Sequence, residues 1–266
     1  MSEYPDLSSL DIDTATDGLL SQMFVVRESA PKPWEEAIPK PSKTLELLDG
    51  SCAHAWGDGP PVLLAHGFEG RYSQFAHLIE KTRKSNFKVI GLEMPGHGSA
   101  HALRADPLSF SRAIHAASTA FGSFHTMIGH SQGANAVLHA AANDVLTDNI
   151  VLLAPLVSVE SHLRKTCEMV NLSPEGVDLF LRKVTKLVGV PPSDFEGRAL
   201  SSTLNLPALI IHDREDREVP IADAEKLAAQ WPSASLKISE GLGHRRILAD
   251  TNVANLVHNF LGEPAK

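Results

Sequence analysis

The chain has 266 residues, of which 43% are apolar and 21% are charged, and its formal net charge is −8. This is an ordinary globular composition, with enough apolar material for one large domain or two small ones. The acidic balance argues against a general affinity for nucleic acid or anionic membranes, because both bind clusters of lysine and arginine.

The amino-terminal part of the chain is polar and rich in proline. Residues 1–17 lack the basic start and apolar run of a signal peptide. No stretch of ~20 apolar residues predicts a membrane span. The two cysteines, Cys52 and Cys167, are far apart and suggest reduced thiols. We therefore expect a cytoplasmic protein, with residues 1–43 as an irregular lead-in, because five prolines interrupt them.

From residue 44 onward, short apolar runs alternate with helical patterns. Asp49-Gly50 predicts a hairpin that joins residues 44–48 and 51–56. The alternation predicts an α/β fold with a mostly parallel central sheet and helices on both faces. Strands are expected at 61–65, 87–92, 126–129, 150–154, 208–212 and 236–239, and helices at 72–84, 110–121, 133–142, 222–230 and 253–261.

Residues 156–203 interrupt this alternation. Helices are expected at 162–171 and 174–187, before Pro191-Pro192, and no strand is evident. We interpret the segment as a helical cap inserted into a single domain that spans residues 44–266. Apolar side chains of the cap suit an apolar substrate group, although many of them must pack the cap onto the core: Leu163, Met169, Val170, Leu179, Phe180 and Val184.

Gly129-His130-Ser131-Gln132-Gly133 matches the G-x-S-x-G pattern of a nucleophile on a sharp turn between a strand and a helix. The turn strains the serine backbone, and the two glycines let neighbouring backbone pass without a Cβ clash. The N-terminus of the following helix favours negative charge there. Chance alone can produce the bare pattern in a chain of this length. The apolar strand before it and the Ala-rich helix after it predict that Ser131 is a nucleophile.

A serine nucleophile needs a histidine base and a carboxylate that orients the base. His244 lies between the last expected strand and the last expected helix, where Gly241 and Gly243 leave its ring free to reach Ser131. The residues alone do not choose among the acids. Three candidate carboxylates follow the strand at 208–212: Asp213, Glu215 and Asp216.

Acyl transfer also needs backbone N–H donors for the oxyanion that forms in its transition state. The amide of Gln132 supplies one donor. The loop after the strand at 61–65 supplies the second through Phe68, which contributes its amide and not its ring, while Gly67 permits the tight turn. This chemistry requires no metal and no organic cofactor.

Across residues 62–260 the chain resembles the α/β-hydrolase superfamily, specifically its capped, esterase-like branch. The resemblance implies the α/β-hydrolase fold. The acid loop of the family, His-Gly-x-x-Asp-x-x-Val-Pro, aligns with residues 212–220 and selects Asp216, with Asp213 in place of the glycine. It also implies that His97 is structural and that His66 and His130 are supporting residues. Four motifs carry it, in order: Ala65-His66-Gly67-Phe68, Met94-Pro95-Gly96-His97-Gly98-Ser99, Gly129-His130-Ser131-Gln132-Gly133 and Gly243-His244.

A serine at the turn argues against haloalkane dehalogenases and epoxide hydrolases, which resemble this fold but carry aspartate there. We expect a carboxylesterase-like serine hydrolase that acts on a small-molecule ester through an acyl-enzyme. A thioesterase or a carbon–carbon bond hydrolase would use the same triad, and a non-catalytic binding protein is a further alternative. Arg245 and Arg246 either attract an anionic substrate or form salt bridges, and we favour salt bridges.

Overall fold

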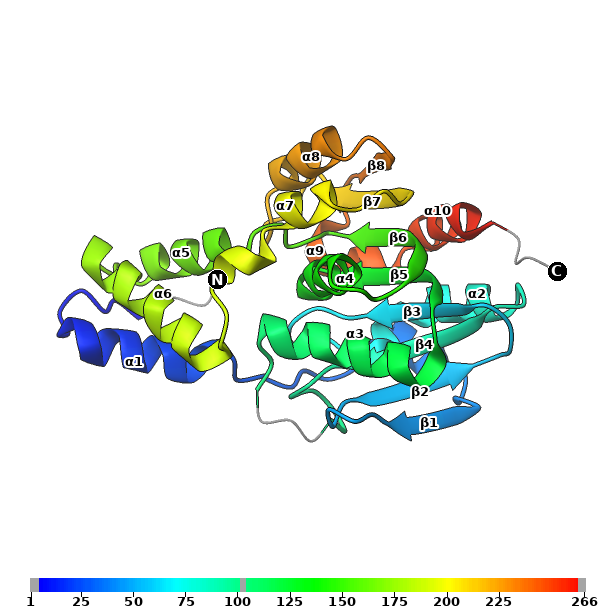
Figure 1. Ribbon diagram of the computed structural model, residues 1–266, viewed down its shortest axis with the longest axis horizontal. Helices are drawn as coiled ribbons and strands as arrows, with labels where there is room; N and C mark the ends of the chain where they lie inside the picture. The colour runs from blue at the N-terminus through cyan, green and yellow to red at the C-terminus, as the bar shows by residue number, and fades with distance from the viewer. Residues whose placement is uncertain (1–4, 101–103, 263–266) are drawn as a thin grey trace.

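The computed structural model describes residues 5–100 and 104–262, which form one eight-stranded sheet covered by helices (Figure 1). The strand order is β1-β2-β4-β3-β5-β6-β7-β8. β2 pairs antiparallel with β1 and β4, and the strands from β4 to β8 pair in parallel. The predicted mostly parallel sheet is confirmed. The strands are β1 (Lys43–Glu46), β2 (Cys52–Trp56), β3 (Pro61–Ala65), β4 (Lys88–Glu93), β5 (Phe124–His130), β6 (Thr147–Leu153), β7 (Ala208–Asp213) and β8 (Ala234–Ser239).

Helices lie on both faces of the sheet, as predicted. On β3, Leu63 packs in the cluster on one face and Leu64 in the cluster on the other, because successive side chains of a strand point to opposite faces. Burial on both faces explains why these strands are continuous apolar runs. The first face carries α3 (Pro107–Phe121), α4 (Gln132–Ala142) and α8 (Ile221–Gln230), and the second carries α2 (Ala76–Arg83) and α10 (Thr251–Leu261).

The expected helices are present, and their ends differ from the predictions by a few residues. α3 shows why: it begins at Pro107, before its apolar pattern starts, because the Asp106 carboxylate accepts the Ser109 N–H and caps the helix. None of the helices in the described part of the chain has the length and apolar character needed to cross a bilayer. The helix expected at 72–84 begins with the 3₁₀ turn η2 (Tyr72–Phe75), which leads directly into α2. Short helices not predicted are η1 (Pro33–Ala37), α7 (Gly197–Ser202), α9 (Gly243–Arg246) and η4 (Ile247–Ala249).

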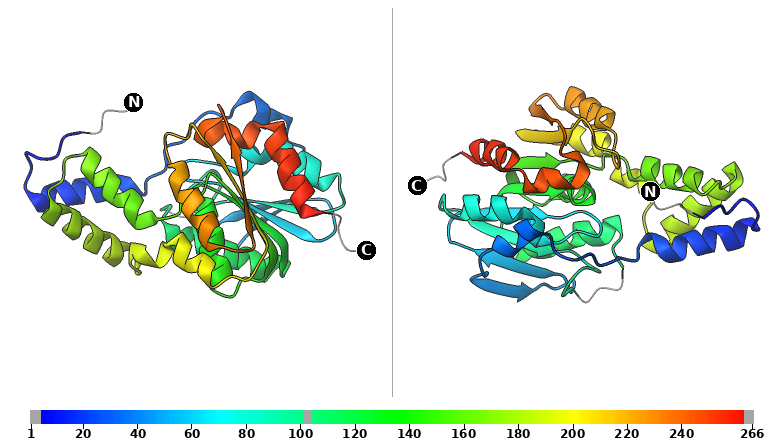
Figure 2. Two further views of the ribbon diagram at one scale, coloured as in Figure 1. Left: turned by 90° about the horizontal axis from the view of Figure 1, so that it is seen from above. Right: turned by 180° about the vertical axis from the view of Figure 1, so that it is seen from behind.

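The cap follows the carboxyl end of β6 and lies to one side of the sheet in every view (Figures 1 and 2). It consists of α5 (Val159–Met169), α6 (Pro174–Val188) and η3 (Pro192–Phe195), with an apolar cluster of its own. α7 packs against α4 and α8 instead. The end of the 156–203 segment therefore belongs with the sheet-covering helices.

The prediction of an irregular lead-in is wrong at α1 (Ile12–Met23), a helix that lies beside α6 of the cap (Figure 1). The Asp11 side chain caps its start by accepting the Thr14 N–H. Leu19, Leu20 and Met23 recur at helical spacing and pack on the cap cluster. The prolines that suggested irregularity flank this helix and do not interrupt it.

Candidate active site

Ser131 lies at the junction of β5 and α4, with φ 52° and ψ −119°, a conformation that costs a non-glycine residue free energy. The neighbouring glycines make this turn possible. A Cβ on Gly129 would lie 2.4 Å from Cα of Ala134, and one on Gly133 would lie 2.3 Å from the carbonyl oxygen of Ala65. Crossing backbone segments therefore require glycine on both sides of the serine.

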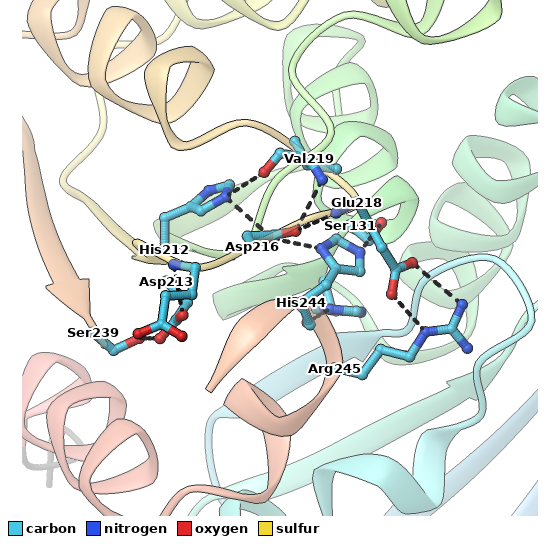
Figure 3. Close-up of polar contacts among 11 residues, drawn as sticks. Ser131, His212, Asp213, Asp216, Glu218, Val219, Ser239, His244 and Arg245 are labelled. Carbon is cyan, nitrogen blue, oxygen red and sulfur yellow. Dashed lines mark hydrogen bonds and ion pairs between the residues drawn. The ribbon is translucent and has the colours of Figure 1, made fainter. Parts of the chain in front are cut away.

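Three side chains from three loops form a continuous hydrogen-bonded line (Figure 3). His244 Nε2 lies 2.9 Å from Ser131 Oγ, and His244 Nδ1 lies 2.7 Å from Asp216 Oδ2. With the Nδ1–H donating to the carboxylate, Nε2 is free to accept the hydroxyl proton of Ser131. The structure thus brings together the three residues that the sequence analysis singled out.

Asp213 ends β7 and Asp216 lies in the loop that follows, and the two carboxylates face different neighbours. The Asp213 carboxylate accepts the N–H groups of Glu215 and Leu242 and the hydroxyl of Ser239. Burial by itself would raise the pKa of Asp213, but these hydrogen bonds outweigh burial and lower it. Since Leu242 is two residues before His244, Asp213 anchors the histidine loop and Asp216 contacts the histidine itself.

His212 is a supporting residue whose contact with the acid the sequence analysis missed. Its side chain is fully buried, and Nε2 lies 3.2 Å from Asp216 Oδ2 and 3.1 Å from the carbonyl oxygen of Val219. Burial would raise the pKa of Asp216, but hydrogen bonds from His212 and His244 and from the Val219 N–H hold it well below its usual range. The acid is therefore an ionised carboxylate beside His244. The only signal in the sequence was the i, i+4 spacing of His212 and Asp216.

The expected oxyanion donors lie beside the serine. The Gln132 N–H is at the first position of α4, where the helix itself supplies no acceptor. Phe68 lies in a loop, and its N–H donates to no backbone carbonyl oxygen among the described residues. A Cβ on Gly67 would lie 2.9 Å from Cβ of Ser131. Glycine at this position is what lets the Phe68 loop approach the nucleophile.

Three histidines around the site hold backbone in place. His97 Nε2 accepts the N–H of Glu69, the residue after Phe68, while His97 Nδ1 donates to the Pro95 carbonyl. Burial, together with the neighbouring His66, lowers the pKa of His97 to about 3. The neutral ring required for this pair of hydrogen bonds is therefore the stable form at neutral pH.

His66 and His130 act in the same way. His66 Nε2 accepts the N–H of Met94, which joins the loops after β3 and β4. His130 Nε2 donates to the carbonyl oxygen of His244, 2.8 Å away, and burial holds the pKa of His130 well below its usual range. A neutral His130 thus ties the backbone of the candidate base to the turn that carries Ser131.

A pocket of about 590 Å³ opens above Ser131 between the sheet and the cap. Of the apolar cap residues named from the sequence, Leu163 and Val170 line it, whereas Phe180 and Val184 pack inside the cap and Met169 is exposed. Arg245, at the rim, pairs with Glu218 at 3.1 Å. Arg246 donates to the Gly241 carbonyl. The two arginines thus make contacts within the protein, as the salt-bridge interpretation expected for Arg245.

The model of the alpha/beta hydrolase fold family matches residues 60–187. Pimeloyl-(acyl-carrier protein) methyl ester esterase from Xanthomonas campestris is 25% identical over 77% of this chain and 96% of its own length. (E)-2-((N-methylformamido)methylene)succinate hydrolase from Acinetobacter baylyi is 42% identical over 67 residues, which are 24% of this chain and 25% of that protein.

A solved structure shares the fold. The meta-cleavage product hydrolase from Pseudomonas fluorescens superposes with a TM-score of 0.62 at 21% identity, over 84% of this chain and 98% of that one. The family match ends at residue 187, before the loops of Asp216 and His244. The roles of those two residues therefore rest on the geometry of the site.

Proposed function

Since the chain belongs to the α/β-hydrolase superfamily, we propose that it is a serine hydrolase that cleaves carboxylic esters through an acyl-enzyme on Ser131. The observation that carries the proposal is the line of hydrogen bonds from Ser131 through His244 to Asp216, at the floor of a pocket. The likeness to an esterase over most of both chains supports the choice of esters.

The first half of the reaction forms the acyl-enzyme. His244 Nε2 takes the hydroxyl proton as Ser131 Oγ bonds to the ester carbonyl carbon, and Asp216 stabilises the imidazolium that results. The Phe68 and Gln132 amides donate to the oxyanion. When the tetrahedral intermediate collapses, the carbon–oxygen bond to the alcohol breaks, and His244 returns its proton to the leaving alcohol.

The second half repeats these steps with water. His244 removes a proton from water, the hydroxide adds to the acyl carbon, and Ser131 Oγ leaves with the proton that His244 gives back. The strained backbone of Ser131 holds Oγ in place throughout, since the crossing backbone at Gly129 and Gly133 leaves the turn no room to relax.

The proposal is tested with short p-nitrophenyl esters and the variant Ser131→Ala. We expect steady turnover by the unaltered chain and loss of roughly 10³-fold or more in kcat for the variant. An unchanged melting temperature and circular dichroism spectrum would show that the fold is intact. Turnover by folded Ser131→Ala at the original rate would contradict the proposal.

A second candidate is cleavage of a carbon–carbon bond next to a carbonyl, which the same three residues support. The observation in its favour is the fold shared with the meta-cleavage product hydrolase, and this likeness at 21% identity concerns the fold alone. A panel of simple esters, thioesters and vinylogous diketones separates the possibilities. We expect the highest kcat/KM on the esters, and a preference for the diketones or thioesters would assign the site to those substrates instead.

A binding protein on the same scaffold is the alternative that needs no chemistry. It has no use for a serine held in strain beside a histidine that is oriented by an ionised acid. A fluorophosphonate probe distinguishes the two, because it bonds only to an activated serine. Labelling at Ser131 supports the hydrolase, and absence of labelling on the folded chain supports the binding protein.

A further inference from the structure

The amino-terminal segment, which the family match does not include, forms one wall of the pocket above Ser131. Helix α1 lies along α6 on the side of the molecule that holds the cap (Figures 1 and 2). The family match begins at residue 60, so this wall is an addition to the matched part of the fold. Its contributions to the pocket lining come from the chain before α1, the second half of α1 and the chain after it: Pro5, Leu7, Gly18, Leu19, Gln22, Met23, Phe24, Val25 and Arg27.

The positions within α1 share one side of the helix. Gly18, Leu19, Gln22 and Met23 stand at i, i+1, i+4 and i+5, so these four positions lie on adjacent parts of one face of the helix. The neighbouring face of α1 contacts α6, where Lys183 Nζ lies 2.6 Å from Asp17, 2.9 Å from Thr16 and 3.1 Å from Asp13. α1 is therefore fixed to the cap by one face and turns another face to the pocket.

Gly18 is an unusual residue for the interior of a helix, where glycine is destabilising relative to alanine. Packing does not require it, because a Cβ at this position would meet no atom within 4 Å. Its φ does not require it either, since Gly18 is absent from the residues with positive φ in the described part of the chain. What glycine provides here is open space on the side of α1 that lines the pocket.

Apolar side chains make up much of the lining between α1 and the cap, beside the polar Gln22, His162 and Thr166. Leu19 and Met23 on α1 face a lining that includes Leu156, Val159 and Leu163. The charged groups of the described lining are Arg27 in the chain after α1, Glu69 in the loop beside Ser131, and Glu218 and Arg245, which pair with each other. An uncharged alkyl chain suits the apolar part of this lining, because its burial there removes apolar surface from water.

We propose that α1 determines the length of the apolar chain that the enzyme accepts, with esters of extended alkyl chains as substrates and the chain lying between α1 and α5. This inference rests on the proposed function, because it concerns the substrate of the same serine. The open space at Gly18 admits the far part of the alkyl chain, and the side chains of Leu19 and Met23 limit its width.

The test uses phosphonofluoridates that carry either a methyl or a decyl chain and follows the rate of Ser131 labelling by mass spectrometry. The variant Gly18→Leu fills the open space, and Ser21→Leu is its matched control. Ser21 lies in the same helix and is also exposed, but it does not line the pocket. A third variant, Leu19→Ala, widens the wall.

We expect the ratio of decyl to methyl labelling rates to fall about tenfold in Gly18→Leu, which corresponds to about 1.4 kcal/mol, because the added side chain fills the space that the decyl chain would occupy. The ratio rises in Leu19→Ala and is unchanged in Ser21→Leu. Equal ratios in all variants, or an equal change in Gly18→Leu and Ser21→Leu, would overturn the proposed role of α1 and leave the proposed hydrolase function intact. Absence of labelling by either probe on the unaltered chain would instead contradict the proposed function on which it rests.

Discussion

Asp213 and Asp216 are three residues apart, and their carboxylates make different contacts beside His244. Asp216 contacts His244 and is held ionised by His212 and by backbone N–H groups. Asp213 stabilises the loop that leads to His244 through the N–H of Leu242. At the scale of single residues, the site therefore has one carboxylate that contacts the ring of His244 and another that holds the backbone before His244.

Substitutions at the two aspartates should separate these tasks. We expect Asp216→Asn to lower kcat roughly 10³–10⁴-fold, because the amide no longer stabilises the imidazolium or fixes the ring tautomer. Asp213→Asn should lower kcat about tenfold or less and reduce the free energy of unfolding by about 1–3 kcal/mol, since it loses acceptors for buried donors. Kinetics on a short ester and urea unfolding measure both effects. A larger loss of kcat at Asp213 would reverse the assignment.

At the scale of elements, the loops after β3, β5, β7 and β8 converge because the carboxyl ends of parallel strands lie at one edge of the sheet. These loops approach one another so closely that a Cβ at Gly67, Gly129 or Gly133 would clash with neighbouring atoms. The cap contributes the opposite wall, and α1 joins it through Lys183. Chain segments far apart in sequence thus enclose one pocket.

The approach of the β3 loop to the nucleophile predicts a strong effect of one methyl group. Gly67→Ala would place its Cβ 2.9 Å from Cβ of Ser131, so the loop must move and carry the Phe68 amide away. We expect kcat to fall ~10²-fold, as for loss of one oxyanion donor. Ser21→Ala is the control, because Ser21 does not line the pocket. Equal activity of Gly67→Ala and the unaltered chain would exclude Phe68 as a donor.

The attachment of α1 to the cap predicts a change in local stability. Lys183→Met removes the ammonium group that contacts Asp13, Thr16 and Asp17, so α1 should separate from α6 more often. We expect limited proteolysis to cut within residues 5–27 several-fold faster, because cleavage requires local opening. Lys186→Met, on the same helix, is the control. Equal cleavage rates in the two variants would show that Lys183 does not hold α1.

At the scale of the whole molecule, folding buries histidines in their neutral form. Burial and the neighbouring His66 lower the pKa of His97 to about 3, whereas an unfolded histidine has a pKa of ~6.5. As the pH falls below about 6.5, the unfolded chain takes up a proton that the folded chain does not. The stability that His97 contributes is therefore fully present above about pH 6.5 and is lost progressively toward pH 3.

This linkage is measurable by urea unfolding at about pH 7.5 and about pH 5.5. Each such histidine costs about 1.4 kcal/mol over this whole window, because the unfolded chain takes up its proton mainly below about pH 6.5. We expect His97→Gln to be less stable at the higher pH, but to lose about 1.4 kcal/mol less on acidification than the unaltered chain. Identical losses in both proteins would show that His97 is not buried neutral.

Much of this architecture was predictable from the sequence because buried parallel strands and amphipathic helices leave distinct local patterns. Ser131 and His244 were found because sharp turns need glycine at fixed spacing. Helix α1 was missed because its apolar residues pack against the cap, which is distant in the sequence, and because the flanking prolines obscured the N-cap at Asp11. The contact of His212 with Asp216 depends on how the loop folds back over Val219, and the i, i+4 spacing of the two residues does not by itself specify that contact.

The most direct measurement is the identity of the residue that becomes acylated. A short p-nitrophenyl ester is mixed with excess enzyme, the reaction is quenched in acid within one turnover, and the peptides are mapped by mass spectrometry. We expect the acyl group on Ser131, with a matching burst of p-nitrophenol, and neither in Ser131→Ala. Turnover without an acylated residue, or an acyl group on any other side chain, would contradict the proposed mechanism.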